Sequence, residues 1–336
     1  MHECTFKITK GFSVMDLYLA PLEGITGYIF RNAVNDYFGR DISKYFTPFI
    51  EPHIQKKNLT HRELNDILPE HNNKLDLIPQ IMTNSSEAFL LLEKEIERFG
   101  YRELNINLGC PSPTVTSKYR GSGLLSDPDR LDRMLDSIFA NTQCEISVKT
   151  RIGYSDPEEW QRILEIYNKY PLKELIIHPR VRDEFYQREV HMDAFLYALR
   201  NSSLRICYNG DINSTVDFIN MKELCLKNAG KLPDAVMCGR GMIANPKLLQ
   251  NMFACNESIS NDLLLSPNEA LSFTDRVLND YLCIMSGETP ALHKMKEIWS
   301  WMAKTFPDSE KGLKKLLKAK NITEYNKAVR TILHIK

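Results

Sequence analysis

Eight short apolar runs recur along residues 14–238, and each ends close to a glycine, a proline or a polar side chain. Runs of this length that stop at turn-forming residues are typical of buried strands. We therefore predict strands over residues 14–20, 45–50, 77–82, 104–108, 146–150, 175–178, 204–208 and 235–238.

The segments between these runs carry apolar residues at helical spacing. The pattern predicts helices over residues 86–99, 128–139, 158–167, 193–199, 215–226 and 246–253. Eight strands that alternate with helices over about 250 residues are the signature of a (β/α)₈ TIM barrel. A doubly wound sheet is the competing topology, but no Gly-x-Gly-x-x-Gly follows the first strand, which counts against a dinucleotide-binding version.

The pattern changes near residue 258, after which only helical periodicity appears. Residues 257–266 are typical of a linker, and helices are predicted over residues 270–285, 291–304, 311–319 and 323–335. We therefore predict a catalytic barrel over residues 1–257 and a small all-helical domain over residues 258–336.

The helical tail is basic although the whole chain has a formal net charge of zero. Residues 291–336 hold eleven Lys or Arg and four Asp or Glu, which gives a local charge of about +7. Clustered cations are typical of phosphate-backbone binding, and a solvated helix face is the alternative. The candidate lysines are Lys294, Lys304, Lys311, Lys314, Lys315, Lys318 and Lys320. Trp299 and Trp301 nearby are expected to pack rather than to stack on bases.

Composition argues against several other classes of protein. No run of about 18 uncharged apolar residues is present, and the first residues lack the apolar core of a signal peptide. The eight cysteines show neither Cys-x-x-Cys spacing nor a paired-histidine pattern, which argues against zinc and against a disulfide framework. We expect a reduced, cytoplasmic protein that holds no metal and no membrane anchor.

Cys110 follows one predicted strand at the point where Gly109 ends the apolar run. In a barrel of this kind, the carboxyl ends of the strands surround one cavity that holds the chemistry. A lone cysteine is often only a buried space-filling residue. Its position after a strand instead makes Cys110 a candidate catalytic thiol.

Other polar residues also follow predicted strands. Gly210 and Gly239 come after the last two strands, where backbone N–H groups can approach a phosphate closely. Lys149 ends an apolar strand and needs an ion-pair partner or an electron-rich ligand. Together with Gln80 and His178, these residues suit a planar ligand with a phosphate tail, and flavin mononucleotide (FMN) fits that description better than a sugar phosphate.

These segments resemble the dihydrouridine synthase family, flavoenzymes that reduce specific uridines in tRNA. The motifs that carry the resemblance are residues 19–26, 105–111, 121–125, 147–153, 178–182, 209–212 and 238–241. The resemblance spans residues 14–253 and extends more loosely to the lysine-rich tail. Pro179 and Thr116 depart from the family pattern, which usually has glycine and often asparagine at these positions.

The resemblance implies a role for each matching residue. The FMN-binding residues would be Pro21, Leu22, Gln80, Lys149, His178, Asn209, Asp211, Gly239 and Arg240. Cys110 would be the catalytic acid, and Asn107 would hydrogen-bond the uracil. Arg151, Arg180 and Arg182 would lie near the target nucleotide.

The implied reaction is the FMN-dependent reduction of the C5–C6 double bond of a uridine in tRNA to 5,6-dihydrouridine. Reduced flavin would supply the hydride, Cys110 the proton, and NADPH or NADH the electrons that restore the flavin. A proton donor must be a thiol, so we expect the pKa of Cys110 to be at or above its ordinary value. The alternatives are a flavin oxidoreductase of the same barrel type that acts on free pyrimidines, and a non-catalytic RNA-binding barrel.

Overall fold

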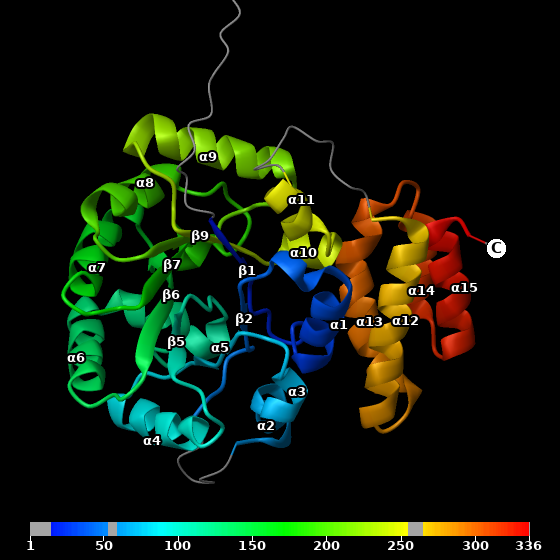
Figure 1. Ribbon diagram of the computed structural model, residues 1–336, viewed down its shortest axis with the longest axis horizontal. Helices are drawn as coiled ribbons and strands as arrows, with labels where there is room; N and C mark the ends of the chain where they lie inside the picture. The colour runs from blue at the N-terminus through cyan, green and yellow to red at the C-terminus, as the bar shows by residue number, and fades with distance from the viewer. Residues whose placement is uncertain (1–14, 53–58, 255–264, 336) are drawn as a thin grey trace, which may run out of the picture.

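A ring of parallel strands forms the centre of the molecule (Figure 1). The computed structural model describes residues 15–52, 59–254 and 265–335. Its strands are β1 (Asp16–Leu19), β2 (Lys44–Phe46), β3 (Leu77–Ile78), β4 (Gln80–Ile81), β5 (Glu103–Leu108), β6 (Glu145–Gly153), β7 (Glu174–Val181), β8 (Ile206–Tyr208) and β9 (Ala235–Cys238). They pair in the order β3-β2-β1-β9-β8-β7-β6-β5-β4.

The ring closes at Pro79, the single residue between β3 and β4. β3 pairs with β2, whereas β4 pairs with β5, so the two segments join opposite ends of the sheet. The carbonyl of Pro79 accepts a hydrogen bond from the backbone N–H of Asn105 at 2.9 Å. The nine segments therefore form the predicted eight-stranded barrel, with the strand expected over residues 77–82 divided at a residue that has no N–H.

The second predicted strand is shorter than expected. We expected residues 45–50, but β2 ends at Phe46, and Ile50 makes only an isolated bridge to Ile81. Pro48 lies between them and cannot donate to a neighbouring strand, which explains the early end.

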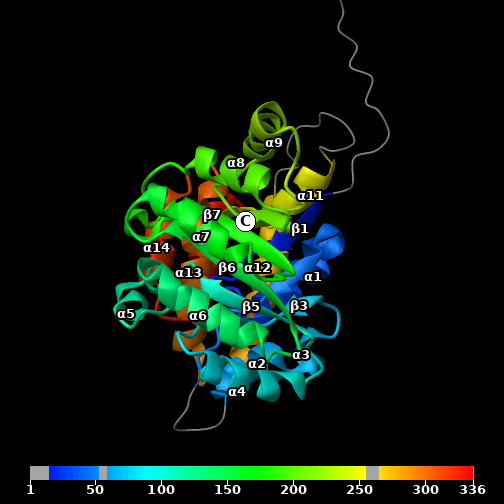
Figure 2. The ribbon, with the colours of Figure 1, turned by 90° about the vertical axis from the view of Figure 1, so that its left-hand side faces the viewer.

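Helices cover the outside of the ring (Figures 1 and 2). They are α1 (Tyr28–Phe38), α4 (Ser86–Glu97), α6 (Pro128–Phe139), α7 (Trp160–Tyr167), α8 (Met192–Asn201), α9 (Thr215–Ala229), α10 (Arg240–Ala244) and α11 (Leu248–Ala254). Sequence reasoning predicted no helix at α1 or α10, and it also missed α2 (His61–Ile67) and α3 (Pro69–Asn72), which follow β2. A capping box of Thr60 and Glu63 begins α2, and that local signal was present in the sequence.

Four helices flank the barrel on the side of α1 and α10 (Figure 1). They are α12 (Pro267–Ile284), α13 (Glu288–Met302), α14 (Glu310–Lys318) and α15 (Ile322–Leu333), close to the predicted ranges. Phe273 of α12 packs edge-on against Phe30 of α1, with 5.8 Å between the ring centroids. Trp299 is buried and donates to the Tyr325 hydroxyl at 2.8 Å, which confirms its predicted packing role.

The predicted domain boundary between residues 257 and 258 lies outside the described residues. Among the residues that are described, no helix combines the length and the apolar character needed to cross a membrane.

Side chains fill the interior of the barrel. Tyr18, Phe46, Ile176 and Met237 pack together there, and the Tyr18 hydroxyl donates to buried Glu174 at 2.9 Å. Because the interior is filled, a ligand can bind only outside it, and in a barrel of this kind the binding site lies at the carboxyl ends of the strands.

Candidate active site

A cavity opens at the carboxyl ends of the strands. Eight of the nine residues predicted to bind the cofactor line it, and they come from the ends of β1, β6, β7, β8 and β9: Pro21, Leu22, Lys149, His178, Asn209, Asp211, Gly239 and Arg240. Residues that are distant in sequence thus meet at one opening, as the barrel topology predicts.

Asn107 holds the loop that carries Cys110. Its side-chain oxygen accepts the backbone N–H groups of Gly109 at 3.0 Å and Cys110 at 2.9 Å. Its amide nitrogen donates to the side-chain oxygen of Gln80 at 2.7 Å. Asn107 therefore fixes the turn in which the thiol lies. We had predicted only that Asn107 hydrogen-bonds the uracil, so this structural role was not expected.

Gln80 is the predicted cofactor residue that does not line the cavity. It is 1% exposed, and its amide nitrogen donates to Asn105 at 2.8 Å. Asn105 in turn donates to the Ser147 hydroxyl at 2.9 Å. The chain of polar side chains across β4, β5 and β6 supports Asn107, because the amide of Gln80 is hydrogen-bonded to protein on both its oxygen and its nitrogen.

A short 3₁₀ helix, Gly121–Ser126, packs directly behind Cys110. The hydroxyl and the backbone N–H of Ser122 both donate to the Cys110 carbonyl, at 2.8 and 3.1 Å. Gly121 has φ of +54°, and a Cβ there would lie 2.8 Å from that same carbonyl oxygen. The glycine is required by both its backbone conformation and this close approach.

Burial raises the pKa of the Cys110 thiol, while the backbone at Ser112 and the positive charge of Arg151 oppose the shift less strongly. The expected direction is therefore found, and a thiol with a raised pKa stays protonated near neutral pH.

Lys149 is the least compensated charge at the mouth. Burial, followed by the charge of Arg151, lowers the pKa of its amine to about 8. Within residues 15–52, 59–254 and 265–335, no carboxylate forms an ion pair with it. The alternative explanation of Lys149, a structural ion pair, is therefore not supported, because the described part of the chain provides no carboxylate partner for it.

Asp211 joins two arginines from neighbouring strand ends. It forms ion pairs with Arg180 and Arg240. Burial favours the neutral acid, but the hydrogen bonds and charges of the two arginines outweigh it and lower the pKa of Asp211. Arg180 is also buried and donates to His178 at 3.0 Å, so contact with a substrate would require breaking its pairing with Asp211.

His178 is surrounded by cations, and burial together with the charges of Arg151 and Lys149 lowers its pKa well below the usual range. The ring is therefore neutral. Because the Arg180 guanidinium donates to Nε2, the proton is on Nδ1.

Arg151 and Arg182 bind the surrounding loops. Arg151 is fully buried and donates to the carbonyls of Gly109, Val181 and Phe185 at 2.7 to 3.0 Å. Arg182, which was predicted to lie near the target nucleotide, donates to the Thr116 hydroxyl at 2.9 Å. Thr116, one of the two departures from the family pattern, therefore helps to hold this arginine in place.

The second departure, Pro179, lies inside β7. The β6–β7 register shifts between Arg151 and Gly153, and the backbone N–H of His191 donates to the Pro179 carbonyl at 2.7 Å. The irregular pairing is consistent with a residue that cannot donate to a ladder.

Sequence reasoning missed Tyr186, which lines the cavity and is 49% exposed. The guanidinium groups of Arg240 and Arg151 lie 4.5 and 5.2 Å from its ring centroid, and its ring stacks against His178 at 5.6 Å. The residue lies in a loop with no periodic pattern, so only the tertiary structure shows that it reaches the mouth.

No group of three or more His, Cys, Asp or Glu able to hold a metal ion occurs among the described residues.

Comparison with known proteins identifies the family. The family model described as dihydrouridine synthase matches residues 18–333. The chain belongs to the dihydrouridine synthase family. It is 29% identical to the probable tRNA-dihydrouridine synthase 2 of Bacillus subtilis over 238 residues, which cover 68% of this chain and 69% of that protein.

A second relative, the probable tRNA-dihydrouridine synthase of Staphylococcus aureus, is 28% identical over 233 residues and 68% of each chain. Among solved structures, morphinone reductase matches with a TM-score of 0.49 and 11% identity, over 74% of this chain and 87% of that chain. Family membership confirms the predicted resemblance and the class of enzyme, an oxidoreductase.

Alkylation tests the protonation state of this family member's thiol. Because the pKa of Cys110 is raised, its thiolate fraction is small at neutral pH, and reaction with iodoacetamide should be slow there and increase as pH rises. Mass spectrometry of each cysteine peptide would follow the reaction, with exposed Cys283 as the internal comparison. Faster modification of Cys110 than of Cys283 at neutral pH would contradict the assignment.

Proposed function

We propose that this protein reduces the C5–C6 bond of a uridine in tRNA to 5,6-dihydrouridine, with FMN as cofactor and Cys110 as proton donor. The observation that carries the proposal is that Lys149, partly buried and without a carboxylate partner in the described structure, lines the mouth and lies close enough to the Cys110 thiol for each group to influence the pKa of the other. β5 and β6 place these groups together, since Asn107 and Lys149 are register partners.

The lining fits a flavin with a phosphate tail. Lys149 offers a charge to an electron-rich ring edge, and the amide of Asn209 lies at the same cavity. A Cβ at Gly239 would lie 3.3 Å from Ala20 and 3.4 Å from Leu22, so the glycine leaves space beside the N-terminal end of α10 and Arg240. Arg240 and backbone N–H groups near Gly239 would hold the phosphate.

When bound, the flavin supplies the hydride for one carbon of the double bond, and NADPH or NADH provides the electrons. The protein side of the reaction is to hold a proton at the sulfur of Cys110 and release it to the other carbon. Asn107 and Ser122 fix the backbone on both sides of that sulfur, which keeps the thiol within reach of a bound base.

The basic helical region would position the RNA. Lys311, Lys314, Lys315 and Lys318 are exposed and share one face of α14 at helical spacing. A base held inside folded RNA cannot enter a barrel, so the uridine must be unpaired or extruded, and contacts outside the barrel must hold the rest of the strand.

Replacing Cys110 by alanine tests the proposed chemistry. We expect Cys110→Ala to bind flavin and oxidise NADPH normally but to lose uridine reduction, because only the proton donor is removed. Nucleoside mass spectrometry of tRNA incubated with flavin-loaded protein would measure the product, which has two more hydrogen atoms than uridine. Cys283→Ala is the matched control at an exposed cysteine.

Dihydrouridine formed by Cys110→Ala at the normal rate would contradict the role of the thiol. Reduction of free uridine, with tRNA left unmodified by the native protein, would instead support the small-molecule oxidoreductase.

The salt dependence of tRNA binding tests the basic face. If the α14 lysines contact phosphates, affinity should decrease steeply with salt, and each lost contact should lower the slope by about 0.7 to 0.9. We expect Lys314→Ala with Lys315→Ala to reduce the slope by about 1.5 in filter-binding titrations. Lys227→Ala with Lys231→Ala, near the end of α9, is the control, and equal slopes for the two double variants would exclude the α14 face from the interface.

A further inference from the structure

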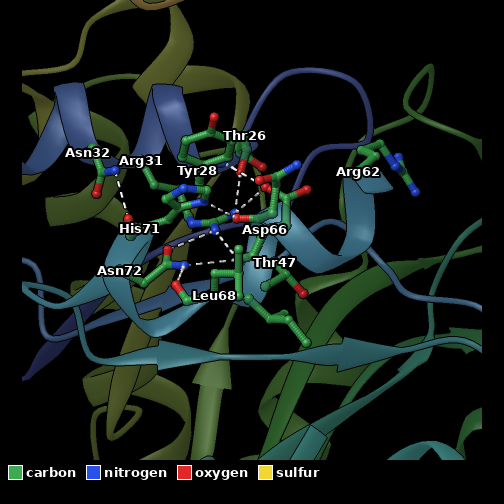
Figure 3. A network of polar contacts seen from close by, with 12 residues as sticks. Thr26, Tyr28, Arg31, Asn32, Thr47, Arg62, Asp66, Leu68, His71 and Asn72 are labelled. Atoms are coloured by element: carbon green, nitrogen blue, oxygen red, sulfur yellow. Dashed lines mark hydrogen bonds and ion pairs between the residues drawn. The ribbon is translucent and has the colours of Figure 1, made fainter. Parts of the chain in front are cut away.

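A second cavity lies at the seam between the barrel and the helical region. α2, the loop after β1, the C-terminal end of α12 and Lys294 of α13 enclose it. Its lining includes Tyr28, His71, Asp66, Arg62, Ile284 and Lys294, and Figure 3 shows the polar network that forms its barrel side. Nothing in the proposed reduction uses these residues.

The loop after β1 connects the two cavities. Pro21 and Leu22 line the mouth of the barrel, and the next two residues, Glu23 and Gly24, line the second cavity. Consecutive Cα atoms are about 3.8 Å apart, so the two sites are neighbours on the scale of one nucleotide. The nucleotide beside a base held in the mouth would therefore be within reach of the seam.

One wall of the seam cavity is flat and aromatic. The Tyr28 and His71 rings are stacked, with centroids 4.4 Å apart and planes 11° from parallel. Ile284 and Tyr281 of α12 provide apolar surface in the same cavity. A flat aromatic wall of this kind suits an unstacked base, because every base has a flat face that can stack on an aromatic ring.

The polar element of the cavity is a carboxylate with spare accepting capacity. Oδ1 of Asp66 accepts the backbone N–H of Tyr28 at 2.7 Å and lies 3.5 Å from the Arg31 guanidinium (Figure 3). Oδ2 has no hydrogen-bond donor among the described residues, although the side chain is nearly buried and lines the cavity. A ligand with N–H donors would satisfy that oxygen.

Guanine is the base that matches this carboxylate. Its N1–H and N2–H donors are adjacent on one edge, whereas the single ring N–H of uracil is flanked by two carbonyl oxygens that a carboxylate repels. Arg62 is half exposed at the rim and pairs there with Glu23, and Lys294 donates to the Gly24 carbonyl at 2.6 Å. A phosphate at this rim would have to replace Glu23 as the partner of Arg62.

We propose that the seam cavity binds an unstacked guanine of the RNA strand beside the target nucleotide. This inference rests on the proposed function, because it takes the target base to lie in the neighbouring mouth. It makes the seam a determinant of which uridine is reached.

Ligand binding to the full-length protein tests the site without any turnover. Saturation-transfer NMR with GMP, IMP and UMP should show GMP binding at least about tenfold more tightly than IMP, which lacks the N2 amino group, and more tightly than UMP. Ile284→Trp should abolish the GMP signal by filling the cavity from an exposed position. Leu226→Trp, at an exposed position of α9, should leave it unchanged.

A second arm decides between RNA and a free nucleotide. Short single-stranded RNAs with guanosine or inosine beside a uridine should differ in affinity, and Ile284→Trp should remove the difference. Equal binding of GMP, IMP and UMP, or GMP binding that Ile284→Trp does not change, would overturn the site. GMP binding without any effect of Ile284→Trp on RNA affinity would overturn its assignment to RNA.

These measurements do not depend on the proposed reduction. Loss of dihydrouridine formation with an intact GMP signal would count against the reaction alone, and the reverse result would count against the seam cavity alone.

Discussion

Concentrated positive charge at the barrel mouth is the constraint on which the site depends. Two buried arginines, Arg151 and Arg180, converge there with the partly buried Lys149 and Arg240. Asp211 is the carboxylate that pairs with Arg180 and Arg240. Arg151 is satisfied by backbone carbonyls, which leaves Lys149 as the cation without a strong partner in the described structure. Because an uncompensated buried charge is costly, the mouth is suited to an electron-rich, anionic ligand.

Rigidity is the second property of the site, and it comes from polar contacts between strands. The series Asn107, Gln80, Asn105 and Ser147 crosses three adjacent strands and ends at the turn that carries Cys110. Each amide in the series is hydrogen-bonded on both its oxygen and its nitrogen, so its geometry is set before any ligand arrives. The thiol thus lies on a fixed support, as the proposed role of Cys110 as proton donor requires.

The sequence was sufficient for the barrel and for most of the mouth, because both follow from local patterns. Apolar runs locate the strands, and in a barrel the residues after them must meet, so Lys149 and His178 could be placed together. The contacts of Gln80 could not be predicted, because its amide bonds to Asn105 and Asn107 only after the strands pair. The ion pair of Arg180 with Asp211 and the seam cavity likewise join residues from separate elements that no local pattern relates.

The pH dependence of flavin affinity tests the central claim most directly. The free protein holds the Lys149 amine at a pKa of about 8, and an electron-rich ligand should favour its protonated form. FMN titrations in a Cys110→Ala background, which removes thiol ionisation, should show a constant dissociation constant from about pH 7, where the FMN phosphate is already mostly a dianion, to about pH 8. Above it the constant should increase by up to about tenfold per pH unit, and the dependence should disappear in Lys149→Met. A dissociation constant that stays flat from about pH 7 to about pH 10 in the presence of Lys149 would contradict the account.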